Sequence, residues 1–202
     1  MHLEKPLITS ALILIVLIIL SGLNPYDRLT WLMEVAPVLI ALPIMAATYK
    51  RFPLTTLLYT LTFIHAVILI AGGHYTYARV PLGFWMQDVL ELARNPYDKI
   101  GHFVQGFVPF IVAREILWRG GYVVRRGMLA FLSVCAVMFV SSFYELVEWW
   151  AALVMGQGAD EFLGTQGDEW DTQADMFFAL IGALAAMLTL SRLHDRQMER
   201  MK

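Results

Sequence analysis

Long apolar runs separated by polar connections dominate this chain of 202 residues. An apolar helix needs about 20 residues to cross the roughly 30 Å hydrocarbon core of a bilayer, at about 1.5 Å of rise per residue. Six runs approach or exceed that length, and we predict that each is a membrane-spanning helix. The predicted spans are residues 7–23, 31–48, 53–72, 101–118, 128–155 and 173–193. The pattern therefore predicts an all-α fold, with residues 1–202 forming a single transmembrane domain built as a polytopic helical bundle.

The first apolar run also has some features of a secretory signal peptide. It follows a cationic residue, Lys5, but it is longer than a usual signal-peptide core and no A-x-A cleavage site follows it. We therefore expect residues 7–23 to be retained as a span.

A shorter pattern lies in the long connection of residues 74–99. Trp85, Val89 and Leu92 recur at helical spacing there, which predicts a short helix over residues 84–92. Such a helix either lies along the outer membrane interface or packs on the bundle as an ordinary loop helix.

The basic residues indicate how the spans are oriented. Lys and Arg collect in the cytoplasmic connections of membrane proteins. One side of the predicted topology carries ten of them: Lys5, Lys50, Arg51, Arg119, Arg125, Arg126, Arg192, Arg196, Arg200 and Lys202. The other side carries four: Arg28, Arg79, Arg94 and Lys99. This bias predicts that both termini are cytoplasmic and that the acidic connection of residues 156–172 faces the periplasm or exterior.

Composition excludes several other classes of protein. Hydrophobic residues make up 58% of the chain and charged residues 16%, whereas soluble domains have about 45–50% and about 25%. This excludes a disordered chain, and a pI near 6.2 argues against nucleic-acid binding. The single cysteine, Cys135, can form neither an intramolecular disulfide nor a C-x-x-C motif. What remains is an integral membrane protein.

Ionisable side chains inside the spans gather toward the predicted outer ends. Burying an ionisable side chain in hydrocarbon costs free energy, so such residues usually belong to a functional site. His65 and Glu148 each precede the outer end of their span by seven residues, which places both about 10 Å below the surface. Glu145 lies about one turn deeper, on the same helix face as Glu148.

Further ligand-type side chains lie at or beside the outer helix ends. Asp98 and His102 are four residues apart at the start of the fourth span, and Asp171 and Asp175 repeat that spacing at the start of the sixth. His74 follows the third span. We therefore expect residues from several spans to meet in the outer half of the bilayer.

Charge in this region is unbalanced. Only Lys99 and three histidines accompany the predicted group of six carboxylates, which are Asp98, Glu145, Glu148, Asp168, Asp171 and Asp175. So many carboxylates cannot all stay ionised in a low-dielectric bundle without partners. Three arrangements would balance this charge. Some acids are protonated, loop cations such as Arg79 and Arg94 pair with them, or a divalent cation is bound.

A divalent metal fits the donor types. Imidazole and carboxylate ligands without thiolate suit zinc first, then manganese, iron or cobalt, and oxygen-only subsets suit magnesium or calcium. The predicted metal ligands are His65, His74, Asp98, His102, Glu145, Glu148, Asp171 and Asp175.

Each pair also has a structural interpretation when it is taken alone. His65 can be a hydrogen-bonded structural residue, and Asp98 can cap the fourth span. Glu145 and Glu148 can share a proton. Two aspartates at a helix N-terminus are favourable anions whatever else they do. The hypothesis of a single joint site depends on all of these residues lying at a similar depth on the outer side of the membrane.

Four segments in order resemble the YjdF-type family of bacterial inner-membrane proteins. They are HAVILIAGGHYTYARVPLG, NPYDKIGHFVQGFVPF, SFYELVEWW and GDEWDTQADMFFALIGAL. The motifs D-K-x-x-H and E-x-x-E more loosely resemble the VanZ-like membrane proteins. The resemblance implies a multi-span membrane protein whose motif residues are Asp98, His102, Glu145, Glu148, Asp171 and Asp175, and it implies no particular reaction.

The leading functional hypothesis is a metal-dependent membrane enzyme or lipid-binding protein that acts at the outer face. A bound metal would activate water and polarise a phosphoryl or carbonyl oxygen, as in a hydrolase or transferase. Glu148 or Asp168 would serve as general base. The partner is the lipid bilayer, with an amphiphilic or lipid-linked cell-envelope substrate whose head group reaches the site from the periplasm or exterior.

Two other functions remain open. A proton- or cation-coupled transporter would use the buried carboxylates as ion sites and needs a polar path to the cytoplasm. The inner halves of the spans offer only Arg114, Glu115 and a few hydroxyls toward such a path. A purely structural polar core, with assembly as the function, is the third.

Overall fold

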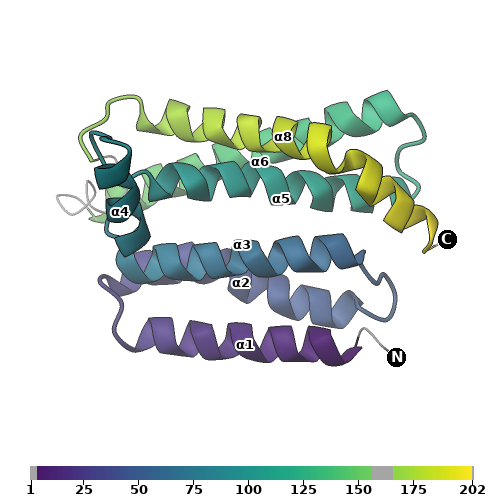
Figure 1. Cartoon of the computed structure of the whole chain (residues 1–202), viewed down its shortest axis with the longest axis horizontal. Helices are drawn as coiled ribbons and strands as arrows, with labels where there is room; N and C mark the ends of the chain where they lie inside the picture. Colours follow the sequence, from purple (N-terminus) through teal and green to yellow (C-terminus); the bar gives the residue numbers. More distant parts are fainter. Residues whose placement is uncertain (1–3, 156–165, 202) are drawn as a thin grey trace. The chain divides into compact units, whose positions relative to one another are not determined.

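A computed structural model describes residues 4–155 and 166–201, and this part of the chain is helical with no β-strand. The helices are α1 (Glu4–Leu23), α2 (Arg28–Thr48), α3 (Thr56–Tyr75), α4 (Pro81–Val89), α5 (Tyr97–Arg119), α6 (Arg126–Met155) and α8 (Asp171–Glu199) (Figure 1). Six of them, all except α4, are long and apolar enough to cross a membrane. The predicted all-α polytopic fold is confirmed.

Helices extend past the predicted spans where their ends are polar. α5 begins at Tyr97, so Asp98 lies inside its first turn instead of before the predicted start at residue 101. α8 continues to Glu199, six residues beyond the predicted end at residue 193. A hydropathy pattern stops at the first charged residues, whereas backbone hydrogen bonding continues until a cap or a turn ends the helix. Two acids of the predicted outer connection, Asp160 and Glu161, lie outside the described residues.

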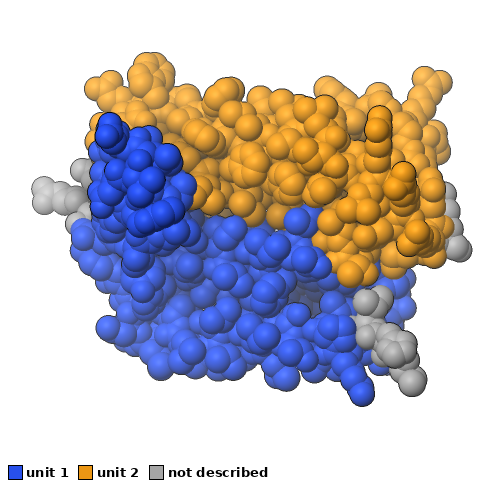
Figure 2. All heavy atoms as spheres, viewed as in Figure 1, with its two compact units in different colours: residues 1–54, 59–97 blue, residues 55–58, 98–202 orange. Residues whose placement is uncertain are grey.

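The chain divides into two compact units (Figure 2). Unit 1 comprises Met1–Leu54 and Tyr59–Tyr97, and unit 2 comprises Thr55–Leu58 and Asp98–Lys202. Helix α3 is therefore shared, because its first turn belongs to unit 2 and the rest of it to unit 1.

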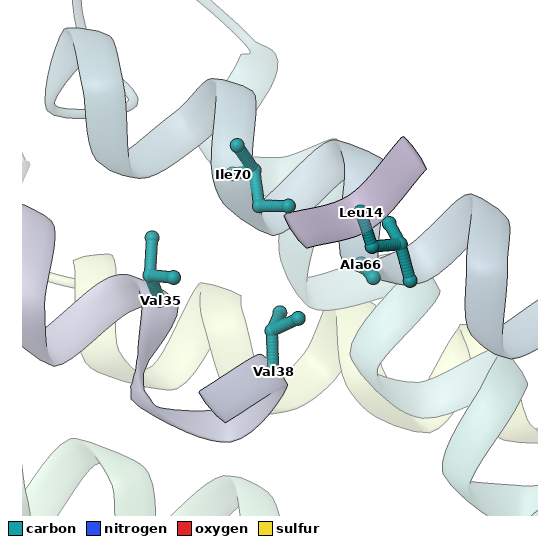
Figure 3. Packing of buried hydrophobic residues seen from close by; sticks show 5 residues of the cluster. All are labelled: Leu14, Val35, Val38, Ala66 and Ile70. Atoms are coloured by element: carbon teal, nitrogen blue, oxygen red, sulfur yellow. The ribbon is translucent and has the colours of Figure 1, made fainter. Parts of the chain in front are cut away.

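Unit 1 is held by an apolar seam between its three long helices. Leu14 of α1, Val35 and Val38 of α2, and Ala66 and Ile70 of α3 form this buried cluster (Figure 3). The spacings of three and four residues place each pair on one face of its helix. Packing of these side chains, with the remaining faces of the helices exposed to lipid, is the usual arrangement of a membrane bundle.

In unit 2, α5 and α8 approach almost backbone to backbone. A Cβ atom at Gly106 would lie 1.8 Å from the carbonyl oxygen of Ala179, and one at Gly182 would lie 1.9 Å from that of Phe103. Small residues at such a crossing allow close van der Waals packing where no hydrophobic force acts between helices. The crossing lies about one turn from His102 on α5 and from Asp175 on α8, so it brings the polar first turns of both helices together.

Candidate functional site

The first turns of α5 and α8, together with one residue of α6, form a buried polar group that we call the Lys99 cluster. Its members are Asp98, Lys99, His102, Glu145, Asp171 and Asp175, all in unit 2. Four of these side chains belong to residues that are less than a tenth exposed: His102, Glu145, Asp171 and Asp175. The prediction that imidazole and carboxyl groups of these separate helices meet therefore matches the arrangement of these six residues.

Lys99 lies between the two aspartates of α8. Its Nζ atom is 2.7 Å from Oδ1 of Asp171 and 2.7 Å from Oδ1 of Asp175, and it is 3.8 Å from Oδ2 of Asp98. An ammonium group has three donors, and two of them here link α5 to α8. The sequence indicated Lys99 as the one cation flanking the carboxylates, but it did not predict the two contacts of Lys99 with Asp171 and Asp175.

His102 lies near two of the same carboxylates, those of Asp98 and Asp175. Its Nε2 atom is 3.5 Å from Oδ1 of Asp98 and 3.7 Å from Oδ1 of Asp175. Its Nδ1 atom is 2.9 Å from Oε1 of Gln105 and 3.9 Å from Oε1 of Glu145. An amide oxygen can only accept, so Nδ1–H donates to Gln105 with the amide assigned in this way. In the neutral ring, this tautomer leaves the Nε2 lone pair directed toward the aspartates, as in a metal-binding histidine.

Asp98, His102 and Asp175 can act as a ligand set. One ligand atom from each of the three lies within 4.8 Å of the others. Nearby, Oε1 of Glu145 is buried and has no hydrogen-bond partner among the described residues. An unsatisfied buried oxygen usually indicates a missing water, proton or ion. The donor set is one imidazole nitrogen with carboxylate oxygens, which suits zinc, manganese or iron.

The structure also describes the two acids predicted as general base, Glu148 and Asp168. Glu148 follows Glu145 on α6 and is close enough to interact electrostatically with His102. Asp168 precedes α8, where its Oδ1 atom accepts a hydrogen bond of 2.9 Å from the backbone N–H of Trp170.

Two predicted ligands, His65 and His74, belong to unit 1. His74 places Nδ1 2.8 Å from the carbonyl oxygen of Ser21, a contact that ties the end of α3 to α1. His65 lies mid-way along α3, and its buried Nε2 atom has no hydrogen-bond partner among the described residues. Within unit 1, His74 therefore makes a structural contact between α3 and α1.

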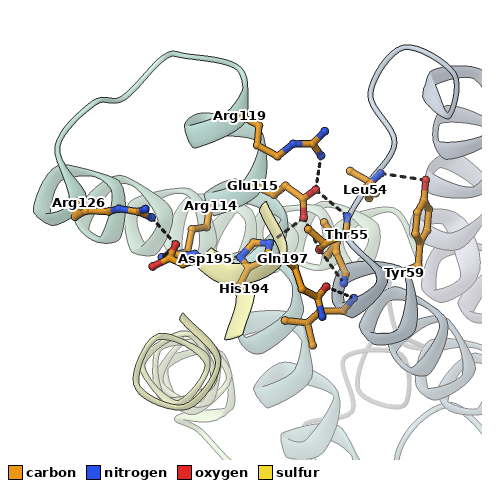
Figure 4. A network of polar contacts seen from close by, with 12 residues as sticks. Leu54, Thr55, Tyr59, Arg114, Glu115, Arg119, Arg126, His194, Asp195 and Gln197 are labelled. Carbon is orange, nitrogen blue, oxygen red and sulfur yellow. Dashed lines mark hydrogen bonds and ion pairs between the residues drawn. The ribbon is translucent and has the colours of Figure 1, made fainter. Parts of the chain in front are cut away.

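A second polar group, which we call the Glu115 cluster, lies at the opposite end of α5. Its members are Thr55, Arg114, Glu115, Arg119, His194 and Asp195, all in unit 2 (Figure 4). Glu115 and His194 are fully buried. The sequence pattern indicated Arg114 and Glu115 here but missed His194 and Asp195, because the predicted sixth span ended at residue 193. The absence of Gly and Pro from residues 194–199 was the available signal that the helix continues.

Both carboxylate oxygens of Glu115 are saturated with donors. Oε1 accepts from the backbone N–H of Thr55 at 2.9 Å and from Arg119 at 2.6 Å. Oε2 accepts from the Thr55 hydroxyl at 2.7 Å and from Nε2 of His194 at 2.8 Å. Four donors match the roughly four lone-pair sites of an ionised carboxylate. Glu115 therefore caps the start of α3 while it pairs with α8.

The partners of His194 define its tautomer. Its Nδ1 atom is 3.1 Å from Nη1 of Arg114, and a guanidinium can only donate. Nδ1 must therefore accept, so that Nε2 carries the proton donated to Glu115. Arg114 also donates to Asp195 at 2.6 Å, and Arg126 pairs with the same carboxylate.

Comparisons with known proteins agree with the membrane architecture. The family described as "Predicted membrane protein (DUF2238)" matches residues 6–196. The inner membrane protein YjdF of Escherichia coli (strain K12) is 61% identical over 198 residues, which cover 97% of this chain and 95% of that protein. No solved structure matches. The YjdF-type resemblance is confirmed, and the VanZ-like resemblance stays a prediction.

Proposed function

Because the chain belongs to the DUF2238 family of predicted membrane proteins and is a multi-pass inner-membrane protein, we propose that its Lys99 cluster is a divalent-metal site. The site binds or acts on an amphiphilic cell-envelope substrate. It faces the periplasm or exterior, as the distribution of basic residues predicts.

The convergence of three ligand-type atoms carries the proposal. Asp98 and His102 are supplied by α5 and Asp175 by α8, with their ligand atoms within 4.8 Å of one another. Glu145 supplies the nearby unsatisfied oxygen. Helix bundles commonly build metal sites in this way, from inward side chains of facing helices.

The charge of the cluster supports the same conclusion. The four carboxylates face one permanent cation, Lys99, and one titratable histidine. If all four carboxylates are ionised and His102 is protonated, two negative charges are left over among these six residues, and a divalent cation would neutralise them. Lys99 and the metal would then share Asp175, so metal binding draws that carboxylate away from the ammonium group.

The chemistry follows from the location of the site within a membrane span. A divalent metal held there lowers the pKa of bound water and polarises a phosphoryl or carbonyl oxygen, which would serve a hydrolase or a transferase. Glu148 or Asp168 would act as general base. A head group that reaches the start of α5 leaves its acyl chain in the surrounding lipid, so the substrate class is amphiphilic.

Metal content after purification tests the proposal. The protein, extracted in detergent and equilibrated with zinc or manganese, is desalted and analysed by elemental mass spectrometry. We expect about one metal ion per chain for the unmodified protein and loss of that metal in His102→Ala and Asp175→Asn. Glu199→Gln is the matched control, because it removes an exposed carboxylate from the far end of the same α8. Metal content that is unchanged in both cluster variants would overturn the assignment.

Coupled transport is the second candidate function. The observation in its favour is that ionisable groups are buried at both ends of α5, around His102 and around Glu115. The intervening part of α5 is lined by buried apolar residues, Val108, Phe110 and Ile111, which weakens the case for a continuous polar path. Cation-dependent flux in proteoliposomes that is lost in Asp175→Asn would favour transport over catalysis.

A further inference from the structure

Helix α4 (Pro81–Val89) is the one described helix that is too short to cross a membrane. Its nine residues span about 14 Å, less than half of the hydrocarbon core. Within unit 1, α4 lies across the direction of α1, α2 and α3 at the end where α3 finishes (Figure 1). Because those three helices are membrane spans, α4 runs roughly parallel to the membrane plane.

One face of α4 carries a stripe of large apolar side chains. Leu82, Trp85 and Val89 follow the i, i+3, i+7 pattern of a single helix face. Their exposed fractions are 53%, 61% and 59%. Three large apolar side chains with that exposure on nine residues form a patch that water solvates poorly, so the patch needs an apolar or amphipathic environment.

The other side of α4 is fastened to the protein, which fixes the direction of the stripe. A Cβ atom at Gly83 would lie 1.7 Å from Oδ1 of Asn95, so glycine is required for this contact. Asn95 donates from Nδ2 to the carbonyl of Val80 at 3.1 Å and accepts from the backbone N–H of Tyr97 at 3.0 Å. Gly83 lies roughly 130° around the helix from the centre of the stripe, since successive residues are about 100° apart.

We propose that α4 is an interfacial helix whose Leu82–Trp85–Val89 face inserts into the boundary between head groups and acyl chains. The occupant is the lipid surface itself. Only residues 76–80 separate α3 from α4, and five residues reach at most about 17 Å, so α4 stays beside the end of a membrane span. Trp85 fits this layer, because tryptophan places its apolar ring and polar N–H at the membrane–water boundary. By the orientation predicted above, the leaflet concerned is the outer one.

Depth measurements on single labels test the proposal in the intact protein. With Cys135→Ser as background, Val89→Cys and Asp88→Cys each receive one nitroxide label, and the protein is reconstituted in phosphatidylcholine–phosphatidylglycerol vesicles. Asp88 is the matched control, because it is a neighbouring exposed residue about 100° around the helix. We expect severalfold fewer collisions with a water-soluble nickel chelate, and more with oxygen, at position 89 than at position 88.

Two results would overturn the proposal. Equal nickel access at both positions would place the stripe in water. Shielding of position 89 from both nickel and oxygen would mean that the stripe packs against protein.

A second measurement needs no label. Lipids brominated near the head group should quench the tryptophan fluorescence of the unmodified protein more than that of Trp85→Phe, and equal quenching would contradict insertion of Trp85. The outcome is independent of whether the Lys99 cluster binds metal.

Discussion

The two ends of α5 use similar side chains for opposite purposes. The Lys99 and Glu115 clusters lie about 20 Å apart, judged from the helical rise between His102 and Glu115. Each contains a histidine, several carboxylates and at least one cation. The Glu115 cluster with its neighbour Arg126 sets three arginines against two carboxylates, whereas the Lys99 cluster sets one lysine and one histidine against four.

The difference extends to individual atoms. Every acceptor position of Glu115 is used, and His194 is fixed in one tautomer by Arg114. Oε1 of Glu145 has no hydrogen-bond partner among the described residues. The Nε2 atom of His102 is 3.5 Å from Oδ1 of Asp98 and 3.7 Å from Oδ1 of Asp175. A saturated buried network stabilises a fold, whereas an unsaturated one with excess charge is suited to binding. The two clusters contain similar residue types. Their different roles are therefore better indicated by how many of their hydrogen-bond donors and acceptors are paired.

The largest expected contrast is in stability. Glu115→Ala leaves Arg119, His194 and the N–H of Thr55 without their shared acceptor, so we expect a loss of about 3–5 kcal/mol in unfolding free energy. Glu145→Ala is the counterpart at the other end of unit 2 and should cost much less, because it removes one of the excess carboxylates. Thermal unfolding in detergent compares the two. Equal losses would contradict the division into a structural and a binding cluster.

The helix crossing offers the next largest effect. Gly106→Ala directs a methyl group into the backbone of Ala179, which should cost about 1–3 kcal/mol and separate the first turns of α5 and α8. Metal binding should fall with it. Gly127→Ala is the control, since a Cβ there meets nothing within 4 Å. If Gly106→Ala bound metal as well as the unmodified protein, the crossing would not be what positions the cluster.

Removal of Lys99 tests the assignment of the Lys99 cluster as the binding cluster. In Lys99→Gln the competing ammonium is absent, so we expect zinc affinity to rise by about tenfold, equivalent to about 1.4 kcal/mol, in a titration against a fluorescent chelator. Stability without metal should fall, because the aspartates of α8 lose their partner. Weaker zinc binding in this variant would mean that Lys99 organises the ligands and does not compete with the metal.

A carboxylate outside both clusters provides the baseline for these comparisons. Asp27 caps α2, and its Oδ1 atom accepts from the N–H of Thr30 at 2.7 Å, a hydrogen bond that lowers the pKa of Asp27. A lowered pKa stabilises the fold at neutral pH, and this contribution is lost as the pH falls through that lowered value. We expect Asp27→Ala to cost about 1 kcal/mol at pH 7 and less in acid. Unfolding followed at both pH values checks this, and Asp27→Asn should retain most of the cap.

The membrane spans could be predicted from the sequence, because bilayer thickness sets the length of an apolar run. The polar ends of the helices lie outside the apolar runs, and for this reason His194 and Asp195 were missed. For the site, counting residues along a span gives depth but not direction around the helix. Position along the spans grouped His65 and His74 with the other predicted ligands, and that grouping stays a prediction. In the structure both histidines belong to unit 1, where His74 contacts Ser21. The role of Lys99 depends on how α5 and α8 are rotated at Gly106 and Gly182, and no single-helix pattern contains that information.

The Glu115 cluster also has a consequence for how the protein is made. Its members come from the start of α3, from α5 and from α8, and α8 leaves the ribosome after the other described helices. Until α8 inserts, Glu115 lacks His194 and the backbone at Leu57 lacks Gln197, whose side chain accepts from that N–H at 2.9 Å. A nascent or truncated chain that ends before residue 194 would thus hold an incompletely paired acid at the membrane boundary. We expect membrane proteases to degrade such a chain faster than one in which α8 is complete, because unpaired buried charge destabilises the folded state.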